Sequence, residues 1–345
     1  MNRYFTEIAG NDALRARLGD EIRANTLSHA YIIEGPRGSG KHTLALHIAA
    51  ALSCQRKSDT SEALPCLSCP SCKKILGGNS PDITVIGRED KATLGVEAIR
   101  KLKSDVMVAP NDTDVKVYLI EDAHLMTVQA QNAFLLTLEE PPKYVLFFLL
   151  CESAAQLLET IRSRAQILHT EPLSKKILEE QLCKKHVEAR TLKATDPTEF
   201  SELLATADGK LGIAIELLSA SARKPLIERR TVAKEFVRLC SESKSSSASL
   251  RYLNGLGQKR DILTAQLSTV LLCLRDLLVC KQTDDPPLSF FADAEEAHTM
   301  AYRFTTPELQ RLCNAVTEAI DRLRVNANVR LTLTAMAVEA GLLRL

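Results

Sequence analysis

A glycine-rich segment, EGPRGSGKHT at residues 34–43, carries the first chemistry that can be read in the sequence. Its pattern approaches G-x-x-x-x-G-K-[ST], a loop whose backbone N–H groups cradle phosphates while the lysine contacts the β- and γ-phosphates. An apolar run precedes the loop and a helical pattern follows it, which argues against a mere glycine turn. The predicted nucleotide-binding residues are Gly35, Pro36, Arg37, Gly38, Ser39, Gly40, Lys41, His42 and Thr43.

The residue after the lysine departs from this pattern. His42 stands where a serine or threonine hydroxyl helps to hold magnesium. Thr43 does not replace it, because one helical step turns a side chain by about 100°. Imidazole is also a poor ligand for a hard cation that prefers oxygen. The sequence therefore favours binding of ATP or ADP over hydrolysis, and it argues against bound Mg²⁺.

A pair of carboxylates follows a later strand-like run. VYLIED ends in Glu121 and Asp122, where a phosphate-binding fold places the acidic residues that handle magnesium and water. We interpret them as a degenerate Walker-B-like catalytic pair. Two solvated carboxylates at a strand end are the alternative, and the loop upstream favours the functional interpretation.

Four cysteines form a C-x11-C-x2-C-x2-C array at Cys54, Cys66, Cys69 and Cys72. Cysteines two residues apart can direct both thiolates at one tetrahedral zinc ion, and four protein ligands leave no open position. We therefore predict a structural zinc site. Buried or redox-active cysteines are the alternative, which the close spacing disfavours. The other six cysteines lie in apolar contexts and are interpreted as small core residues.

The composition sets broader limits. The 345 residues suffice for two or three domains, and a net charge of +1 predicts neither an acidic nor a basic partner. The N-terminus lacks the apolar core of a signal peptide, and we expect no run that approaches the apolar length of a membrane span. These features predict a cytoplasmic protein whose cysteines are reduced.

Apolar runs alternate with helical patterns over the first 170 residues, which predicts a parallel sheet covered on both faces. From about residue 173 only helices are expected, with a linker at 241–250 and an interruption at 284–289. The predicted strands are 29–35, 81–87, 115–122 and 144–151, the predicted helices are 41–54, 95–108 and 127–142, and 159–169 is predicted to be a short helix followed by a strand.

These motifs occur in an order that resembles one known family. The loop, the cysteine array, VYLIEDAHLMTVQAQNAFLLTLEEPP and TIRSRA together resemble the bacterial clamp-loader branch of AAA+ proteins. The resemblance covers residues 1 to about 220. Beyond that it rests on length, helical character and the similarity of NANVRLTLTAMAVEAGLL to the family's terminal helix.

The resemblance implies three domains: an AAA+ nucleotide-binding domain at 1–172 with a zinc module at 54–72, a helical lid at 173–222, and a helical collar at 223–345. In the family, the collar joins subunits into a pentameric ring that uses ATP to load the sliding clamp onto primed DNA. The implied partners are the gamma/tau and delta subunits, the clamp and primer–template DNA.

The resemblance also assigns a role to TIRSRA. Ser163 and Arg164 match the family's Ser-Arg-Cys motif, while Ala165 replaces its cysteine. In the family this arginine reaches the ATP site of the neighbouring subunit, so Arg164 is the expected arginine finger, acting in trans. Without the motif, an ordinary surface or helix-capping arginine would be the preferred interpretation.

Several residues around the predicted nucleotide site differ from those of the family members that hydrolyse ATP. The family resemblance implies a delta-prime type of subunit within DNA polymerase III, with weak or absent ATPase activity. A gamma/tau-like or other AAA+ ATPase ranks second, and a zinc-stabilised scaffold without nucleotide is a third interpretation. The departures are His42, the reversed order Glu121–Asp122, Cys151 and Glu152 where threonines are usual, and Gly212 where a sensor arginine is usual.

Overall fold

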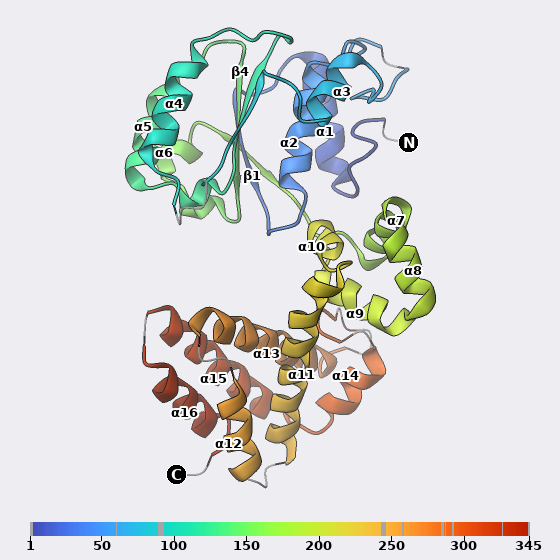
Figure 1. Cartoon of the computed structure of the whole chain (residues 1–345), viewed down its shortest axis with the longest axis vertical. Coiled ribbons are helices and arrows are strands. Elements are labelled where there is room, and N and C mark those ends of the chain that lie inside the picture. Colours follow the sequence, from blue (N-terminus) through green and yellow to red (C-terminus); the bar gives the residue numbers. More distant parts are fainter. Residues whose placement is uncertain are drawn as a thin grey trace. The chain divides into compact units, whose positions relative to one another are not determined.

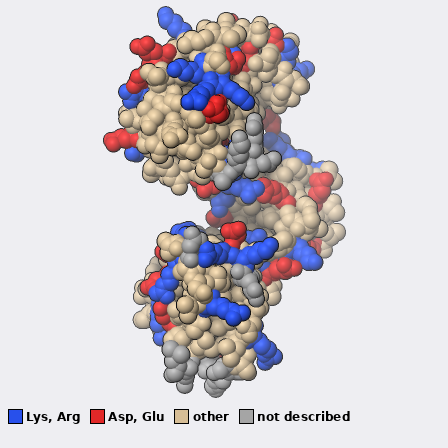
Figure 2. All heavy atoms as spheres, turned by 60° about the vertical axis from the view of Figure 1, so that its left-hand side comes forward, with Lys and Arg blue, Asp and Glu red and all other residues tan. Residues whose placement is uncertain are grey.

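The computed structural model describes the chain apart from residues 1–2, 60, 89–92, 243–245, 257–258, 284–285, 287, 292, 326 and 344–345. The described chain forms two compact units, residues 1–181 with 209–213, and residues 182–208 with 214–345. The first unit contains the phosphate loop, the acidic pair and the cysteine array. The three-domain division at 172 and 222 stays a prediction. On the visible face of each unit, acidic and basic side chains are intermingled (Figure 2).

A five-stranded parallel sheet organises the first unit, in the order β2-β3-β4-β1-β5. The carboxyl ends of parallel strands meet at one edge, so the loop after β1 and the acidic pair after β3 reach the same edge, with β4 between them. This confirms the α/β fold expected of an AAA+ domain. The strands are β1 Ala30–Glu34, β2 Ile83–Ile86, β3 Lys116–Ile120, β4 Val145–Cys151 and β5 Gln166–His169.

Helices cover both faces of this sheet (Figure 1). One face carries α1 Asp12–Ala24, α2 Lys41–Leu52 and α3 Pro70–Leu76, and the other carries α4 Val96–Val106, α5 Val128–Glu139 and α6 Glu159–Arg162. Every residue of β3 and β4 is buried, which explains why these strands read as continuous apolar runs. Neither α1 nor α3 was predicted, because each buries only a few of its side chains.

The second unit is helical, and α13 packs between α11 and α15 in its core. Two further helices, α7 Lys175–Lys185 and α10 Leu211–Glu216, each extend from one unit into the other. The helices of this unit are α8 Val187–Thr195, α9 Pro197–Ala207, α11 Ala220–Glu242, α12 Ser246–Gly255, α13 Arg260–Cys280, α14 Ala294–Ala301, α15 Thr306–Arg324 and α16 Val329–Glu339.

The predicted linker at 241–250 was wrong over most of its length. Residues 241–242 end α11, and residues 246–250 begin α12, whereas 243–245 lie outside the described residues. Ala248, Tyr252 and Leu253 pack against the core of the unit. This packing outweighs the low helix propensity of serine. The predicted interruption near 284–289 is confirmed for residues 286, 288 and 289, which lie between the end of α13 at Cys280 and the start of α14 at Ala294, whereas 284, 285 and 287 lie outside the described residues.

The expectation about membrane-spanning runs also needs correction. By length and composition alone, α13 is apolar enough to cross a membrane. Its residues Leu263, Leu267, Val270 and Leu274 are fully buried in the core of the second unit. A central core helix passes the same test of length and composition, because it is apolar on more than one face.

Asp82, just before β2, fixes the segment that leads into β3. Its buried carboxylate accepts hydrogen bonds from the backbone N–H groups of Asn111 (2.6 Å), Asp112 (2.8 Å) and Thr113 (2.8 Å). Burial alone would raise the pKa of Asp82, but these donors outweigh it and hold the pKa below its usual value. The contact therefore stabilises the start of the β2–β3 pair.

Replacing Asp82 with asparagine should lower the free energy of unfolding by about 2 kcal/mol at pH 7. Because the folded-state pKa is depressed, the carboxylate contributes its stability above the unfolded pKa of about 3.9 and loses it as the pH falls through the folded pKa. Urea unfolding at pH 7 and pH 3 should show the difference between wild type and variant shrinking at the lower pH. The exposed Asp114→Asn is the control, and an equal loss from both variants would contradict the assignment.

Candidate nucleotide and metal sites

The phosphate loop lies between β1 and α2, as predicted. Gly38 (φ +79°) and Gly40 (φ +88°) adopt left-handed backbone conformations that favour glycine. Gly35 is required for a different reason, since a Cβ there would lie 2.0 Å from Oγ1 of Thr170. That hydroxyl also hydrogen-bonds Oγ of Ser39 at 2.8 Å. Contacts at Gly35 and Gly38 therefore leave no space for a side chain there, whereas at Gly40 it is the backbone conformation that favours glycine.

Lys41, the predicted phosphate ligand, is turned toward its own loop. Its Nζ donates to the carbonyl oxygens of Gly35 (2.6 Å) and Pro36 (2.9 Å). Burial lowers the pKa of Lys41, while the charges of Glu152 and Asp122 act in the opposite direction. A phosphate entering the loop must replace these carbonyls as acceptor.

His42 contacts the acidic pair directly. Its Nδ1 lies 2.8 Å from Oε1 of Glu121, and both side chains are 43% exposed. Mg²⁺ requires near-octahedral oxygen ligands, and here the imidazole of His42 occupies the position of the usual hydroxyl and pairs with the carboxylate of Glu121. The residues present therefore do not fit a bound Mg²⁺ ion.

The second acidic residue is also paired. Arg88 places Nε 3.1 Å and Nη2 3.0 Å from Oδ2 of Asp122. Ile86 of β2 pairs with Ile120 of β3, so two residues further on Arg88 and Asp122 lie side by side. Arg88 carries no signal in the sequence, because this proximity depends on the register of two strands.

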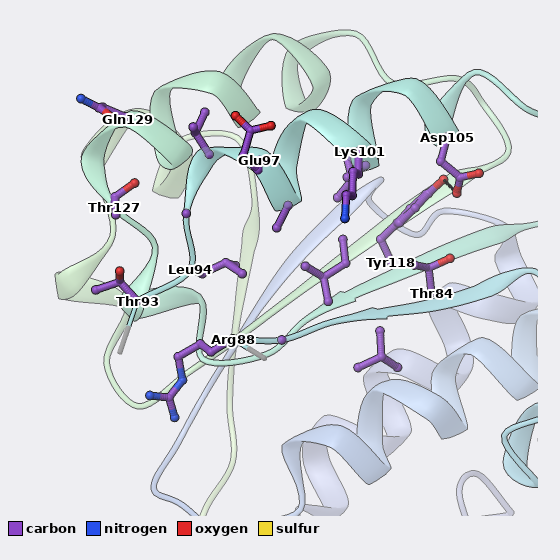
Figure 3. Close-up of a pocket in the computed structure, with 17 residues that line it drawn as sticks. Thr84, Arg88, Thr93, Leu94, Glu97, Lys101, Asp105, Tyr118, Thr127 and Gln129 are labelled. Atoms are coloured by element: carbon purple, nitrogen blue, oxygen red, sulfur yellow. Dashed lines mark hydrogen bonds between the residues drawn. The ribbon is translucent and has the colours of Figure 1, made fainter. Parts of the chain in front are cut away.

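A cavity of about 690 Å³ lies between α4 and the edge strand β2, with Arg88 at one end (Figure 3). Leu94 and Leu102 line it together with Thr84 and Tyr118. The phenol of Tyr118 donates to Oδ2 of Asp105 at 2.8 Å. The cavity thus adjoins the acidic edge of the sheet through the Arg88–Asp122 pair.

Gly212 packs directly on the phosphate loop. Its N–H donates to the carbonyl oxygen of Gly38 at 2.9 Å, and a Cβ at Gly212 would lie 2.9 Å from the Cα of Gly38. A Cβ at Gly38 would in turn lie 2.8 Å from the side chain of Ile213. The backbone at this position therefore excludes an arginine side chain unless the loop shifts.

Arg164 follows α6 and is 37% exposed. Its Nη2 lies 2.7 Å from Oε1 of Glu139, and its Nη1 donates to the carbonyl of Thr160 (2.9 Å) and to Oγ of Ser163 (3.3 Å). Among the described contacts, none joins Arg164 to the phosphate loop or the acidic pair of its own chain. Glu139 lies in the segment LTLEEPP, where nothing in the sequence indicates its contact with Arg164.

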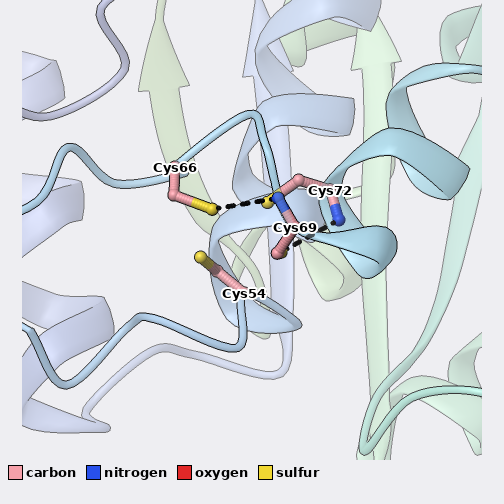
Figure 4. Close-up of side chains that lie close together, drawn as sticks. All are labelled: Cys54, Cys66, Cys69 and Cys72. Atoms are coloured by element: carbon pink, nitrogen blue, oxygen red, sulfur yellow. Dashed lines mark hydrogen bonds between the residues drawn. The ribbon is translucent and has the colours of Figure 1, made fainter.

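The four predicted metal ligands do come together (Figure 4). The sulfur atoms of Cys54, Cys66, Cys69 and Cys72 all lie within 4.8 Å of one another. Four thiolates bound to zinc at about 2.3 Å hold their sulfurs about 3.8 Å apart in a tetrahedron. The cluster can therefore hold a metal ion after small side-chain adjustments.

Backbone N–H groups prepare this cluster for metal binding. The N–H of Cys69 points to the sulfur of Cys66 at 3.4 Å, and the N–H of Cys72 points to that of Cys69 at 3.5 Å. Burial works against ionisation of Cys66, but the N–H of Cys69 and the donors of Ser68 lower its pKa to about 6. Burial raises the pKa values of Cys54 and Cys72. Such N–H···S contacts favour thiolates, which are the species that bind metal.

Comparisons with known proteins agree with this arrangement. Residues 10–174 match the family model described as "DNA polymerase III, delta subunit". The chain is 29% identical to the DNA polymerase III subunit delta′ of Bacillus subtilis, over 91% of each chain. It is 28% identical to subunit tau of the same organism, over 80% of this chain but only 50% of tau.

A solved structure of a DNA polymerase III gamma-subunit-related protein from Thermotoga maritima is 18% identical, with a TM-score of 0.43 over 94% of this chain and 98% of that one. The chain thus spans half of the tau relative and nearly all of the delta′ relative. The family-model match and the extent of these relationships support a DNA polymerase III clamp-loader subunit of the delta-prime type.

Proposed function

We propose that this chain is a clamp-loader subunit that does not hydrolyse ATP itself and that offers Arg164 to the ATP site of a neighbouring subunit. The observation that carries the proposal is the pairing of both acidic residues with basic side chains of the same chain, Glu121 with the imidazole of His42 and Asp122 with the guanidinium of Arg88. A carboxylate already paired in this way is a poor magnesium ligand and a poor guide for the attacking water.

The relatives indicate the setting of this role. We propose that the chain assembles with gamma/tau and delta subunits in the cytoplasm and helps to load the sliding clamp onto primer–template DNA. The helical region at 223–345 would form the contacts within a ring of subunits. ATP or ADP is the proposed ligand of the loop, without Mg²⁺, and zinc is the proposed metal of the cysteine cluster.

The purified chain alone should hydrolyse ATP at a rate close to background, with or without clamp and primed DNA. His42→Ser should recover little activity, because Asp122 stays paired with Arg88 and Gly212 supplies no side chain. A coupled assay of ADP release on both proteins tests this, with the Thr43→Ala variant as a control for substitution in the loop.

The second candidate, a gamma/tau-like ATPase, is favoured by the complete glycine and lysine framework of the loop and by the similarity to tau. Robust hydrolysis by the isolated chain, stimulated by clamp and DNA, would establish that candidate and contradict the proposal.

A further inference from the structure

Arg164 is held by three acceptors of its own chain. Glu139 accepts from Nη2, while the carbonyl of Thr160 and the hydroxyl of Ser163 accept from Nη1. A guanidinium group has five N–H donors in a rigid, planar fork. Within the described part of the chain, two donors therefore stay available for a further acceptor, and they lie on a side chain that is 37% exposed.

The backbone segments that carry Glu139 and Arg164 are held together by packing between α5 and the segment that contains α6. Gln131 of α5 is buried, and its amide accepts from the N–H of Leu158 (2.8 Å) while donating to the carbonyl of Met126 (3.2 Å). Ile161 of α6 is fully buried in the same core. Glu139 at the end of α5 and Arg164 after α6 are consequently held at a set separation.

We propose that Glu139 is a positioning residue for Arg164, an inference that rests on the role proposed for Arg164 above. A free arginine side chain loses considerable rotamer entropy when it is placed against a phosphate. Glu139, acting with Thr160 and Ser163, places the guanidinium before assembly, and the two remaining donors suit a bidentate contact with phosphate oxygens of a nucleoside triphosphate on the neighbouring subunit.

The carboxylate of Glu139 has a second, opposing effect. Its negative charge partly neutralises the guanidinium and weakens attraction to the phosphate. Geometry and charge can be separated, because Glu139→Gln retains an acceptor oxygen without the charge, whereas Glu139→Ala removes both. Glu140, the next residue, is exposed and forms none of the described ion pairs, so Glu140→Ala is a matched control.

The test is the steady-state ATPase of the reconstituted clamp loader with clamp and primed DNA, measured over a range of ATP concentrations. Glu139→Ala should lower the Arg164-dependent part of kcat about three- to fivefold, as expected for loss of one exposed ion pair. The KM and the melting temperature of the chain should stay unchanged. Glu139→Gln should restore kcat at least to the wild-type value, and Glu140→Ala should have no effect.

Adding Glu139→Ala to Arg164→Ala should cause no further loss. Wild-type kcat in Glu139→Ala, an equal loss in Glu139→Gln, or an additive loss in the double variant would each overturn the positioning role while leaving the role of Arg164 intact. If Arg164→Ala itself has no effect, both the finger and its positioning residue are overturned.

Discussion

Replacing Arg164 with alanine is expected to abolish the contribution of one ATP site to the activity of the assembled clamp loader. An arginine finger contributes about 10³- to 10⁵-fold to kcat at the site that it serves. The total rate of ATP hydrolysis should therefore fall by the fraction of that rate that the neighbouring site contributes. ATP hydrolysis by a loader reconstituted with clamp and primed DNA measures the effect, and single-turnover kinetics separate the affected site from the others.

Assembly should be unaffected by this change, because Arg164 is partly exposed and its loss leaves Glu139 in contact with solvent rather than buried and unpaired. Arg162→Ala is the matched control, since Arg162 is exposed, ends the same short helix and forms none of the described ion pairs. Unchanged turnover in the Arg164→Ala loader, or an equal loss from Arg162→Ala, would contradict the finger role.

Replacing Cys72 with serine is expected to remove the bound zinc and to destabilise the first unit by more than about 3 kcal/mol, a fraction of the 10–16 kcal/mol that structural zinc supplies to zinc-finger peptides. Cys72 is fully buried at the start of α3, so the variant also places a hydroxyl in an apolar setting. Metal analysis and thermal unfolding measure the two effects, and treatment of the wild type with a strong chelator should reproduce the loss of stability.

The segment between Cys54 and Cys66 also pairs with the N-terminal residues through Leu64. Loss of the metal should therefore loosen both segments. The N–H of Leu64 donates to the carbonyl of Arg3 at 3.1 Å, and the N–H of Phe5 donates to the carbonyl of Leu64 at 2.7 Å. Limited proteolysis should therefore cut the Cys72→Ser variant within residues 54–72 faster than wild type. Cys183→Ser, outside the cluster, is the control. A wild-type protein purified without chelator that contains no zinc would contradict the assignment.

Features that depend on neighbours along the chain can be predicted from the sequence alone. The strands β3 and β4 were identified because central parallel strands, covered on both faces, are apolar over nearly their whole length. The phosphate loop was identified because its glycines and lysine lie within six residues of one another. The cysteine array was identified in the same way, since three of its four ligands lie within six residues of one another.

Which charged groups contact one another depends on the folded chain. Arg88 reaches Asp122 through the register of β2 on β3, Glu139 reaches Arg164 through the packing of α5 on α6, and Gly212 contacts a loop about 170 residues earlier in the chain. The helix in the predicted linker and the burial of α13 were likewise settled by packing. A short stretch of sequence indicates helix or strand propensity and the spacing of residues. The partner of a charged side chain depends instead on contacts between residues far apart in the chain.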